Sequence, residues 1–557
     1  MKKRKIIAGF ISAVMAFSLA ACGSDVRTEE TKRMSYEDAS AELNSLLKKV
    51  DVHTVSNPSL DIYMDETSKA DALDDIDTFP IVVKGNGDID IEVAAATEMS
   101  ADAPDDWMNV VARNFNKEGY KIDGRTVSVS VRKITSGEAV TYMRDGGYEP
   151  EVFAPSNYAW GEMLKASGLT VNKVTDRIAG NTAGILIRKD VYDEFIKKYG
   201  EATVGNVLDA TINKDLVFAY TNPYTSSTGL NILTAMLKSF DEKDPLSDNA
   251  AQKLIEYQKS SPPVAYTTAV LRQSAAKGVI NAMVMEEQAY INTPELKNYQ
   301  YIPAGIRHDH PVYTFDWDTE EEQKAAEMFV EYCQNEKSQA LATEKGFNRH
   351  DDYEGEDPGM TGTDFLNAQS IWKQNKNGGK PIIAVFVADV SGSMDGEPLN
   401  ALKRSLINGS EYIGSENYIG LVSYSSTVTI NLPVDEFDAT QRAYFSGEVK
   451  SLSAGGGTAT YDAVLVALNM LKEKEKEVPD AKLMLFVLTD GNQNEGYSLD
   501  RVTGIVEGMS VPVYTIAYNY SNTTDLEKLS GINEAACIKA DSADIANQLR
   551  NLFNVQI

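Results

Sequence analysis

The chain has few of the residues that build disulfide frameworks or histidine-based sites, with three cysteines and four histidines among its 557 residues. Cys22, Cys333 and Cys537 are too far apart for a paired metal motif or a disulfide framework. We expect Cys333 and Cys537 to be small buried apolar residues, because both lie among apolar or small neighbours. The apolar run Ile6–Leu19 has 14 residues, too few to span a bilayer.

Positive charge is also scarce. The sequence holds 53 Lys and Arg residues against 82 Asp and Glu residues, which gives a formal net charge of −29. A protein this acidic repels the phosphate backbone, so nucleic acid is excluded as a partner. The same charge fits a surface that attracts cations and, equally, a surface that only keeps the protein soluble. A hydrophobic content of 43% is ample for folding, and the length predicts two or three domains.

The first residues form a targeting segment. A basic head, Lys2–Lys5, precedes the apolar run, and small residues follow it, which is typical of a secretory signal peptide. The sequence Leu19-Ala20-Ala21-Cys22 resembles the lipobox of bacterial lipoproteins. The resemblance implies removal of residues 1–21 and attachment of diacylglycerol to the Cys22 sulfur, with acyl chains such as palmitate that anchor the protein on the extracytoplasmic face of the cell membrane. The alternative is a plain signal peptide in which Cys22 carries no lipid.

Residues 22–85 are expected to form a tether that holds the rest of the protein off the membrane. Leucines at helical spacing within Tyr36–Val50 predict a short amphipathic helix. The stretch Asn57–Pro80 mixes Pro, Asp, Ser and Thr, which is typical of a linker.

Strands and helices alternate from residue 86 to residue 350. Ile89–Ala96 and Thr126–Ile134 have the composition of strands. Asp106–Asn116 and Gly229–Phe240 have the pattern of helices. Because strands that alternate with helices pair in parallel, this region predicts parallel sheets and an α/β fold.

Three stretches of this region, VAAATEMS, EVFAPSNYAW and TNPYTSSTGLNIL, occur in an order that resembles the bacterial extracellular solute-binding proteins of the type II periplasmic-binding class. The resemblance covers residues 86–350. It implies two α/β lobes with a ligand cleft between them, which closes by hinge motion. It also places the crossings between the lobes near Val174–Gly180 and near Tyr299–Pro303.

The third stretch has a physical logic of its own. Its hydroxyl-bearing residues precede a helix, and hydroxyls with free backbone N–H groups at a helix N-terminus attract polar or anionic oxygens. The alternative is that Ser227 or Thr228 only caps the helix. With the loops that the resemblance brings to the same cleft, the predicted ligand-binding residues are Thr97, Ser136, Ser156, Asn181, Ser226, Ser227 and Thr228. The solute stays open between an oxyanion, a sugar and a peptide, and so does a cleft that serves only as a rigid spacer.

The segment His308-Asp309-His310 brings two of the four histidines together. An H-x-H pattern can bind a metal, but without a third ligand in view we expect a polar surface. No Cys/His or Ser/His/Asp arrangement has a recognisable spacing. We therefore do not expect an enzyme, although the many serines leave a catalytic triad open.

A linker is expected over residues 351–380, where Gly, Pro and acidic residues gather, with a short helix at Asp364–Lys373 between its two loop-like stretches. After it, the apolar run Ile382–Ala388 has no alternation, which predicts a strand buried on both faces of a parallel sheet. Asp389, Ser391 and Ser393 follow at the carboxyl end, where open α/β sheets bind their ligands. Buried strands and helices alternate from there onward, which predicts a doubly wound, Rossmann-like sheet.

Two further loops carry oxygen ligands. Thr458 follows a run of glycines, and Asp490 follows the apolar strand Leu483–Leu488. Hydroxyl and carboxylate oxygens suit Mg²⁺, Ca²⁺ or Mn²⁺ and suit zinc poorly. Mg²⁺ accepts an external ligand, for which the carboxylate of a partner is the natural choice. Asp462, one turn into the next helix, is either a group that supports a ligand or an exposed acid.

The combination DxSxS…GGGT…TDG resembles the von Willebrand factor type A domain over residues 381–557. The resemblance implies a metal-ion-dependent adhesion site (MIDAS). In such a site Ser391, Ser393 and Thr458 coordinate the cation through their hydroxyls, and Asp389 and Asp490 hold it directly or through waters. We expect Mg²⁺, with Ca²⁺ or Mn²⁺ as alternatives.

Together these patterns predict a lipid-anchored surface binding protein. It would use the cation site to bind an acidic group of a protein partner, and it would carry a solute-binding-like module. The alternative is the solute receptor of an ABC transporter, in which the A-type domain is accessory.

Overall fold

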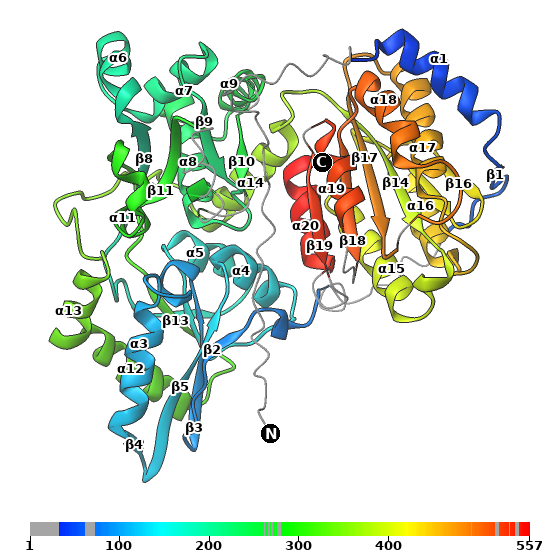
Figure 1. Ribbon diagram of the computed structural model, residues 1–557. Coiled ribbons are helices and arrows are strands. Elements are labelled where there is room, and N and C mark those ends of the chain that lie inside the picture. The colour runs from blue at the N-terminus through cyan, green and yellow to red at the C-terminus, as the bar shows by residue number, and fades with distance from the viewer. Residues whose placement is uncertain are drawn as a thin grey trace, which may run out of the picture. The chain divides into compact units, whose positions relative to one another are not determined.

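The computed structural model describes residues 33–61, 73–260, 262–265, 268, 271–272, 275, 280–491, 493–518, 523–533, 535–540 and 545–557. Cys22 and the expected signal peptide lie outside them. The described residues form two compact units (Figure 1), which we call the single-sheet unit and the two-sheet unit after their main sheets. The single-sheet unit draws on the described residues within 1–62, 381–410 and 415–548, and the two-sheet unit on those within 63–380, 411–414 and 549–557.

Lobe I of the two-sheet unit is built on a sheet with the strand order β2-β5-β3-β6-β13-β7, and β4 pairs with β5. Its strands are β2 (Ile81–Val83), β3 (Ile89–Ala95), β4 (Lys121–Ile122), β5 (Arg125–Lys133), β6 (Val152–Ala154), β7 (Val171–Thr175) and β13 (Val312–Phe315). Its helices are α2 (Thr97–Ser100), α3 (Trp107–Glu118), α4 (Ser136–Arg144), α5 (Ala159–Ala166), α12 (Glu320–Gln334) and α13 (Glu336–Glu344). The central strand β3 pairs in parallel with β5 and β6, as alternation predicted.

The core of lobe I joins segments far apart in the chain. Phe115 of α3 meets Phe329 of α12 with ring centroids 5.3 Å apart. The indole N–H of Trp107 donates to the carbonyl of Ser338 in α13 over 2.9 Å. Cys333 is fully buried in this core, which confirms its expected role as a small apolar residue.

Lobe II has the strand order β10-β9-β11-β8-β12. Its strands are β8 (Thr182–Arg188), β9 (Phe218–Thr221), β10 (Val264–Ala265), β11 (Ala282–Glu286) and β12 (Tyr299–Arg307). Its helices are α6 (Lys189–Tyr199), α7 (Val204–Ile212), α8 (Ser227–Phe240), α9 (Asp248–Gln258), α11 (Glu287–Ile291) and the 3₁₀ turn η3 (Pro294–Asn298).

The chain crosses between the lobes at residues 176–181 and 308–311. The first crossing lies where the sequence predicted one. The second was predicted near Tyr299–Pro303, and that prediction is wrong. Tyr299–Pro303 belongs to β12, which pairs antiparallel with β8 from Tyr299 opposite Arg188 and so completes the sheet of lobe II.

Residues expected to be linker contain α14 (Gly362–Asn375), a helix that packs on both lobes and that we call the strap. Phe365 lies in the core of lobe I, with its ring centroid 6.1 Å from that of Tyr158. Trp372 is fully buried in the core of lobe II, and its indole N–H donates to the Tyr220 hydroxyl over 2.8 Å. The apolar residues of α14, which lie between two loop-like stretches of the sequence, therefore pack into the cores of both lobes.

The last residues, 549–557, also belong to the two-sheet unit. They form the end of α20 (Ile545–Gln556), where Arg550 makes an ion pair with the buried Glu138 of α4. Lys376, just after the strap, donates to the carbonyl of Val555 over 2.9 Å. The residues expected at the end of the A-type domain therefore pack with the two-sheet unit.

The single-sheet unit has the strand order β1-β16-β15-β14-β17-β18-β19 among the described residues. Its strands after residue 380 are β14 (Ile382–Asp389), β15 (Tyr418–Tyr424), β16 (Val428–Glu436), β17 (Lys482–Thr489), β18 (Val513–Tyr518) and β19 (Cys537–Ala540). Its helices there are η4 (Gly392–Met394), α15 (Glu397–Ser410), α16 (Ala439–Ser451), α17 (Thr460–Glu475), α18 (Leu499–Met509) and α19 (Thr524–Gly531). Cys537 is half-buried at the start of β19.

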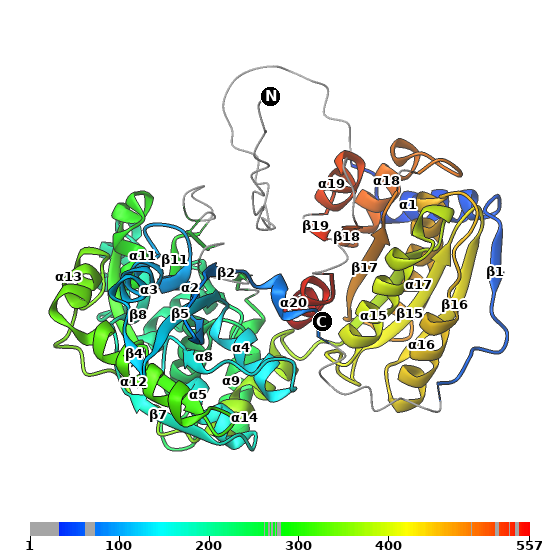
Figure 2. The same ribbon diagram turned by 90° about the horizontal axis from the view of Figure 1, so that it is seen from below.

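Helices cover both faces of this sheet (Figures 1 and 2). Strand β14 is buried along its whole length and pairs in parallel with β15 and β17, as the unbroken apolar run predicted. On one face Phe386 stacks on Phe486 at 5.1 Å and meets Phe445 of α16 edge-on at 5.7 Å. On the other face, α17 and α18 pack over Val385 and Val387.

The expected tether supplies two elements to this unit. The predicted amphipathic helix is α1 (Tyr36–Leu47), and its buried Leu43 and Leu46 pack in the same core as α17 and α18. Strand β1 (Val52–Thr54) pairs in parallel with the edge strand β16. The packing of α1 buries its apolar face, and the pairing of β1 covers the open edge of the sheet. Part of residues 22–85 is therefore folded into this unit and does not form an extended tether.

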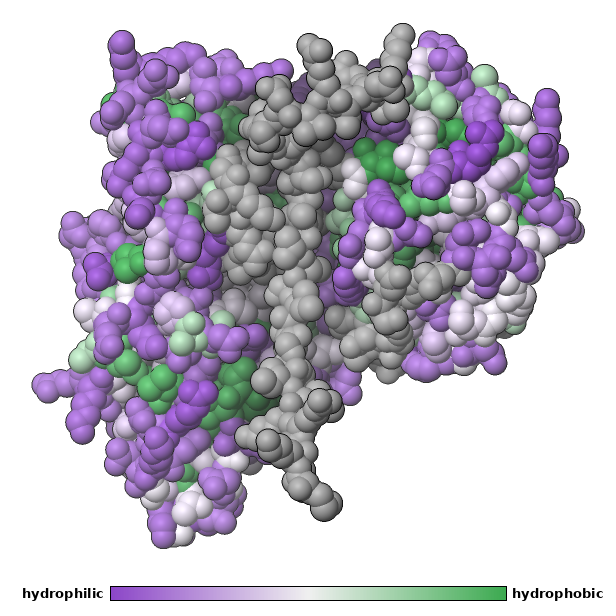
Figure 3. Space-filling model, in the orientation of Figure 1, coloured by the Kyte–Doolittle hydropathy of each residue, from purple (hydrophilic) through white to green (hydrophobic). Residues whose placement is uncertain are grey.

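Hydrophilic residues prevail on the visible surface, and apolar residues form separate small patches (Figure 3). This distribution agrees with the net charge of −29. Among the described residues, no helix combines the length and the hydropathy needed to cross a bilayer.

Replacing Trp372 with Ala should lower the free energy of unfolding of the two-sheet unit by about 3–5 kcal/mol, because a fully buried indole is lost and Tyr220 loses a hydrogen-bond donor. Urea denaturation of the full chain measures the change. Asn367→Ala, at an exposed position of the same helix, is the control and should change stability by less than about 0.5 kcal/mol. A Trp372→Ala protein as stable as wild type would show that the strap is not part of the core.

Candidate functional site

Three loops meet at the carboxyl edge of the single sheet. The loop after β14 carries Ser391 and Ser393, and Asp389 is the last residue of that strand. Thr458 lies just before α17, and Asp490 directly follows β17. The loops are bonded to each other, because the backbone N–H of Gly392 donates to Gly456 over 3.1 Å and that of Gly455 donates to Val390 over 2.8 Å.

A chain of hydrogen bonds links the polar side chains of this edge. The Asp389 carboxylate accepts from the backbone N–H of Ser391 over 2.8 Å and from the Thr489 hydroxyl over 2.6 Å. The hydroxyl oxygens of Ser391 and Ser393 are 3.1 Å apart. The Ser393 hydroxyl then donates to Oδ1 of Asp490 over 2.8 Å. Four of the five predicted cation ligands therefore form one continuous set of oxygens.

Burial falls from one end of this set to the other. Asp389 is fully buried, whereas Asp490 is half-buried and Ser393 is exposed. Burial raises the pKa of Asp389 despite the hydrogen bonds that it accepts. Burial also raises the pKa of Asp490, and the hydrogen bond from Ser393 offsets part of this effect. The site is thus anchored in the sheet and open on the side of Ser393.

Thr458 is held by the loop that follows Asp490. Its backbone N–H donates to Oδ1 of Asn494 over 2.9 Å, and its carbonyl accepts from the Asn494 N–H over 3.1 Å. Asp462 anchors the same loop, because it accepts from the backbone N–H of Tyr497 over 2.8 Å. At Gly496, whose φ is +75°, a Cβ would lie 2.6 Å from the Asp462 carboxylate, so this close approach requires glycine. Asp462 is therefore a supporting group and not a free acid.

The donor set suits a hard divalent cation. All side-chain donors are hydroxyl or carboxylate oxygens, which Mg²⁺ prefers. Six ligands at the Mg²⁺–oxygen distance of about 2.1 Å stand roughly 3 Å apart at octahedral edges, and the oxygens here are 2.8–3.1 Å apart. Among the described residues, no group of three His, Cys, Asp or Glu side chains could hold a metal ion, so a cation at this edge depends on hydroxyls.

A second set of polar groups lies between the lobes of the two-sheet unit. Ser227, the first residue of α8, donates to the Ser136 hydroxyl of lobe I over 3.1 Å. The Ser136 oxygen also accepts from the backbone N–H of Ser156 over 3.2 Å, and the Trp160 indole donates to Ser227 over 2.8 Å. These serines are at most 5% exposed. Three residues predicted for the cleft therefore meet directly across the lobes.

Two other predicted residues have local roles. Ser226 is the N-cap of α8, where its side chain accepts from the backbone N–H of Gly229 over 3.4 Å. The residue that caps α8 is therefore Ser226, whereas the sequence had suggested Ser227 or Thr228 as the cap. Thr97 begins α2 and is half-buried, and no hydrogen bond joins its side chain to the other predicted residues in the part of the chain that the structure describes.

The remaining two predicted residues contact groups that the sequence analysis missed. Asn181 accepts from the backbone N–H groups of Thr182 over 3.0 Å and Gln288 over 3.3 Å. Thr228 donates its hydroxyl proton to the carboxylate of Glu286. Both bonds place the predicted residues beside the end of β11, which carries no motif.

Glu98 and His310 form a buried pair beside the serines. Nε2 of His310 is 3.1 Å from the Glu98 carboxylate, and Nδ1 is 2.9 Å from the carbonyl of Ala179. Burial by itself raises the pKa of Glu98, but the contact with His310 outweighs it and lowers the pKa to about 2. The expectation of a polar surface at His308 and His310 is wrong, because both rings are fully buried at the second crossing.

Glu286 and His308 are the second buried pair, with Oε1 of Glu286 4.0 Å from Nδ1 of His308. Burial, together with repulsion from Glu98, raises the pKa of Glu286 to about 7. Burial lowers the pKa of His308 to about 4. The H-x-H was visible in the sequence, but its pairing with Glu98 and Glu286 was not, because these glutamates reach the histidines only in the folded lobes.

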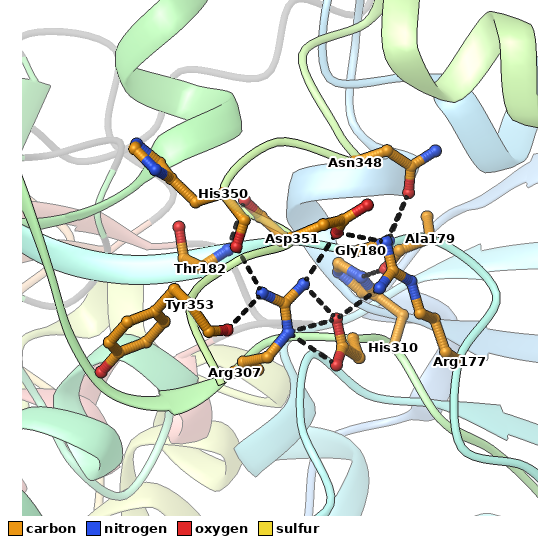
Figure 4. A network of polar contacts seen from close by, with 12 residues as sticks. Arg177, Ala179, Gly180, Thr182, Arg307, His310, Asn348, His350, Asp351 and Tyr353 are labelled. Carbon is orange, nitrogen blue, oxygen red and sulfur yellow. Dashed lines mark hydrogen bonds and ion pairs between the residues drawn. The ribbon is translucent and has the colours of Figure 1, made fainter. Parts of the chain in front are cut away.

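Two arginines tie the crossings together (Figure 4). Arg307 donates to the carbonyl oxygens of His350 and Tyr353 over 2.8 Å each. Asp351 accepts from Arg177 over 2.7 Å and from Arg307 over 3.3 Å. The segment that follows α13 therefore braces both crossings, which positions the lobes around the buried layer.

The geometry defines a protein with a two-lobed binding unit and an α/β unit whose sheet edge carries clustered oxygen ligands. Residues 92–348 match the family described as bacterial extracellular solute-binding protein. Residues 384–554 match the von Willebrand factor type A domain. The chain combines these two domains, and both α/β folds agree with the sequence prediction.

Curated relatives match only in part. Inter-alpha-trypsin inhibitor heavy chain H1 of Sus scrofa is 26% identical over 207 residues, which is 34% of this chain and 22% of that protein. The chain thus spans about a fifth of the length of this relative. Among solved structures, a von Willebrand factor type A protein from Catenulispora acidiphila is 20% identical, with a TM-score of 0.29, and covers 31% of this chain and 42% of its own. The sulfate-binding protein SubI from Mycobacterium tuberculosis H37Rv is 16% identical, with a TM-score of 0.35, and covers 47% and 88%.

Glu286→Gln should make the ligand-free protein more stable than wild type above pH 7, by at most about 3 kcal/mol. The folded-state pKa of Glu286 is raised from 4.5 to about 7. The stability that its proton contributes is therefore complete below pH 4.5 and is lost as the pH rises through 7. Urea denaturation at steps from pH 4.5 to 8 measures the difference between variant and wild type.

Glu295→Gln, at an exposed position of the same lobe, is the matched control and should follow wild type at every pH. A difference between Glu286→Gln and wild type that does not change with pH would contradict the prediction.

Proposed function

We propose that the protein is a surface binding protein that captures a protein partner through a divalent cation. Asp389, Ser391, Ser393, Thr458 and Asp490 would hold the cation, with Mg²⁺ as the first choice and Ca²⁺ or Mn²⁺ as alternatives. A carboxylate of the partner would complete the coordination. The observation that carries the proposal is the continuous set of oxygens from Asp389 to Asp490, open on the side of Ser393.

The chemistry of this edge favours binding over catalysis. A cation-activated water would need a general base beside it, and Asp389, the deepest acid, is already engaged by Ser391 and Thr489. Solute-binding and A-type domains are typically binding modules. We therefore propose that the chain acts without an enzymatic step.

A membrane anchor would support the role of a surface protein. Solute-binding domains are extracytoplasmic, and the lipobox-like sequence that ends in Cys22 provides a lipid attachment point. We propose that Cys22 is lipidated and holds both units at the extracytoplasmic face of the cell membrane.

A second candidate function is that of a solute receptor for an ABC transporter. Two observations favour it: a buried polar layer lies between the two lobes, and ion pairs such as that of Arg177 with Asp351 hold the segments where the chain crosses between them. In this reading the two-sheet unit captures a small molecule and the single-sheet unit is accessory.

Ser393→Ala should weaken Mg²⁺ binding to the full chain at least tenfold, because it removes the exposed hydroxyl that links Ser391 to Asp490. Isothermal titration calorimetry measures the affinity. A pulldown from the native cell envelope, with Mg²⁺ or with EDTA, measures partner capture, which should require both the cation and Ser393.

The control is Thr440→Ala, at an exposed position of α16, which should bind Mg²⁺ and partner as wild type does. Partner capture that survives both EDTA and Ser393→Ala would refute the cation-dependent mechanism.

Cys22→Ser should move the protein from the membrane pellet to the soluble fraction, because the acyl chains lose their attachment point. Cell fractionation and metabolic labelling with a palmitate analogue measure anchoring. Cys537→Ser should keep both the label and the membrane association. A Cys22→Ser protein that stays membrane-bound would show that another segment provides the anchor.

A further inference from the structure

Four residues between the lobes, which we call the unpaired quartet, leave buried polar atoms without a hydrogen-bond partner in the described part of the chain. These atoms are Nδ2 of Asn181, Oε2 of Glu286, Oε1 of Gln288 and both ring nitrogens of His308. The four residues are neighbours, because the backbone N–H groups of His308 and Gln288 both donate to Asn181 and Glu286 lies 4.0 Å from His308. Each is at most 4% exposed.

The free atoms have defined hydrogen-bonding roles. Oδ1 of Asn181 accepts two backbone N–H groups, so its free atom is the donor Nδ2. Nε2 of Gln288 donates to Asp105 over 2.8 Å, so its free atom is the acceptor Oε1. His308 is neutral at pH 7, because burial lowers its pKa to about 4, and a neutral imidazole offers one donor and one acceptor. With Oε2 of Glu286, the quartet offers three acceptors and two donors.

Charge selects among ligands that fit this pattern. Arg272 is paired with Asp105 at 2.9 Å, and His310 is paired with Glu98 at 3.1 Å. Glu286 accepts the hydroxyl of Thr228. Among the described residues its one ion-pair contact is with His308, which is neutral at pH 7. An unpaired buried carboxylate is strongly unfavourable. In keeping with this cost, the pKa of Glu286 is raised to about 7. When Glu286 loses its proton, the layer carries a negative charge that no described cation balances, and a cationic ligand would favour that ionised form.

We propose that the cleft binds a small organic ammonium ion and that Glu286 is its counter-ion, an inference that rests on the solute-binding role proposed above. A primary ammonium group donates three hydrogen bonds, which matches the three free acceptors, and Asn181 is left to donate to an oxygen of the ligand. An oxyanion would meet repulsion from both Glu286 and Glu98. A metal ion is not favoured, because no three His, Cys, Asp or Glu side chains of the described residues stand close enough to hold one.

Thermal unfolding of the full chain tests the proposal, in EDTA so that no cation at the sheet edge contributes. The probes are ethanolamine, putrescine and lysine as ammonium compounds, sulfate, molybdate and phosphate as anions, and glucose and maltose as neutral solutes. At least one ammonium compound should raise the melting temperature, since a ligand of the folded state stabilises it by mass action. Anions and sugars should not.

Variants then assign the charge. For the ammonium compound that binds, calorimetry should give a Kd at least tenfold weaker for Glu286→Gln. The melting temperature of this variant without ligand should be equal to or above that of wild type, which checks that it is folded. His308→Gln should weaken binding as well, and Glu295→Gln should leave it unchanged.

The outcomes distinguish ammonium binding from solute binding in general. A shift with an anion or a sugar and none with an ammonium compound would overturn the ammonium proposal and leave solute binding in place. Ammonium binding that Glu286→Gln does not weaken would overturn the role of Glu286. No shift with any class would overturn the proposal together with solute binding by the two-sheet unit.

Discussion

The parallel pairing of β14 with β15 and β17 is the constraint on which the single-sheet unit depends. A strand buried on both faces satisfies its backbone groups only through its neighbours, and all eight residues of β14 are buried. The interior of the strand therefore holds apolar residues, and the first polar side chain, that of Asp389, lies at its carboxyl end. The hydroxyls of Ser391 and Ser393 and the carboxylate of Asp490 are placed by strands that end at the same edge.

The parts that sequence could predict are those with a local physical signature. The unbroken apolar run of β14, the acid and serines after it, and the glycines before Thr458 each specify a backbone or side-chain property within a few residues. Their common edge follows from strand direction. The same holds for the serines before α8, since a helix N-terminus shows in sequence, although which serine caps and which crosses the cleft was decided by packing.

What sequence could not predict rests on contacts between distant segments. Glu98 and Glu286 are isolated acids whose burial depends on the meeting of the lobes. His308 and His310 are buried at the second crossing, which starts later than the resemblance implied because β12 extends to Arg307. The leucines of α1 predicted an apolar helix face, but they did not predict that this face would pack in the core beside α17 and α18. In each case the sequence pattern does not identify the distant segment that the residues contact.

The strap would couple the proposed solute binding to a helix outside the two lobe sheets. Because α14 packs on lobe I through Phe365 and on lobe II through Trp372, the lobes cannot separate without detaching one end of the helix. Any ligand that favours contact between the lobes therefore also favours the seated helix, and the reverse holds by reciprocity. Residues 376–381 alone separate the strap from β14. If the proposed solute binds between the lobes, its binding would therefore also stabilise the packing of α14, the helix that precedes β14 in the chain.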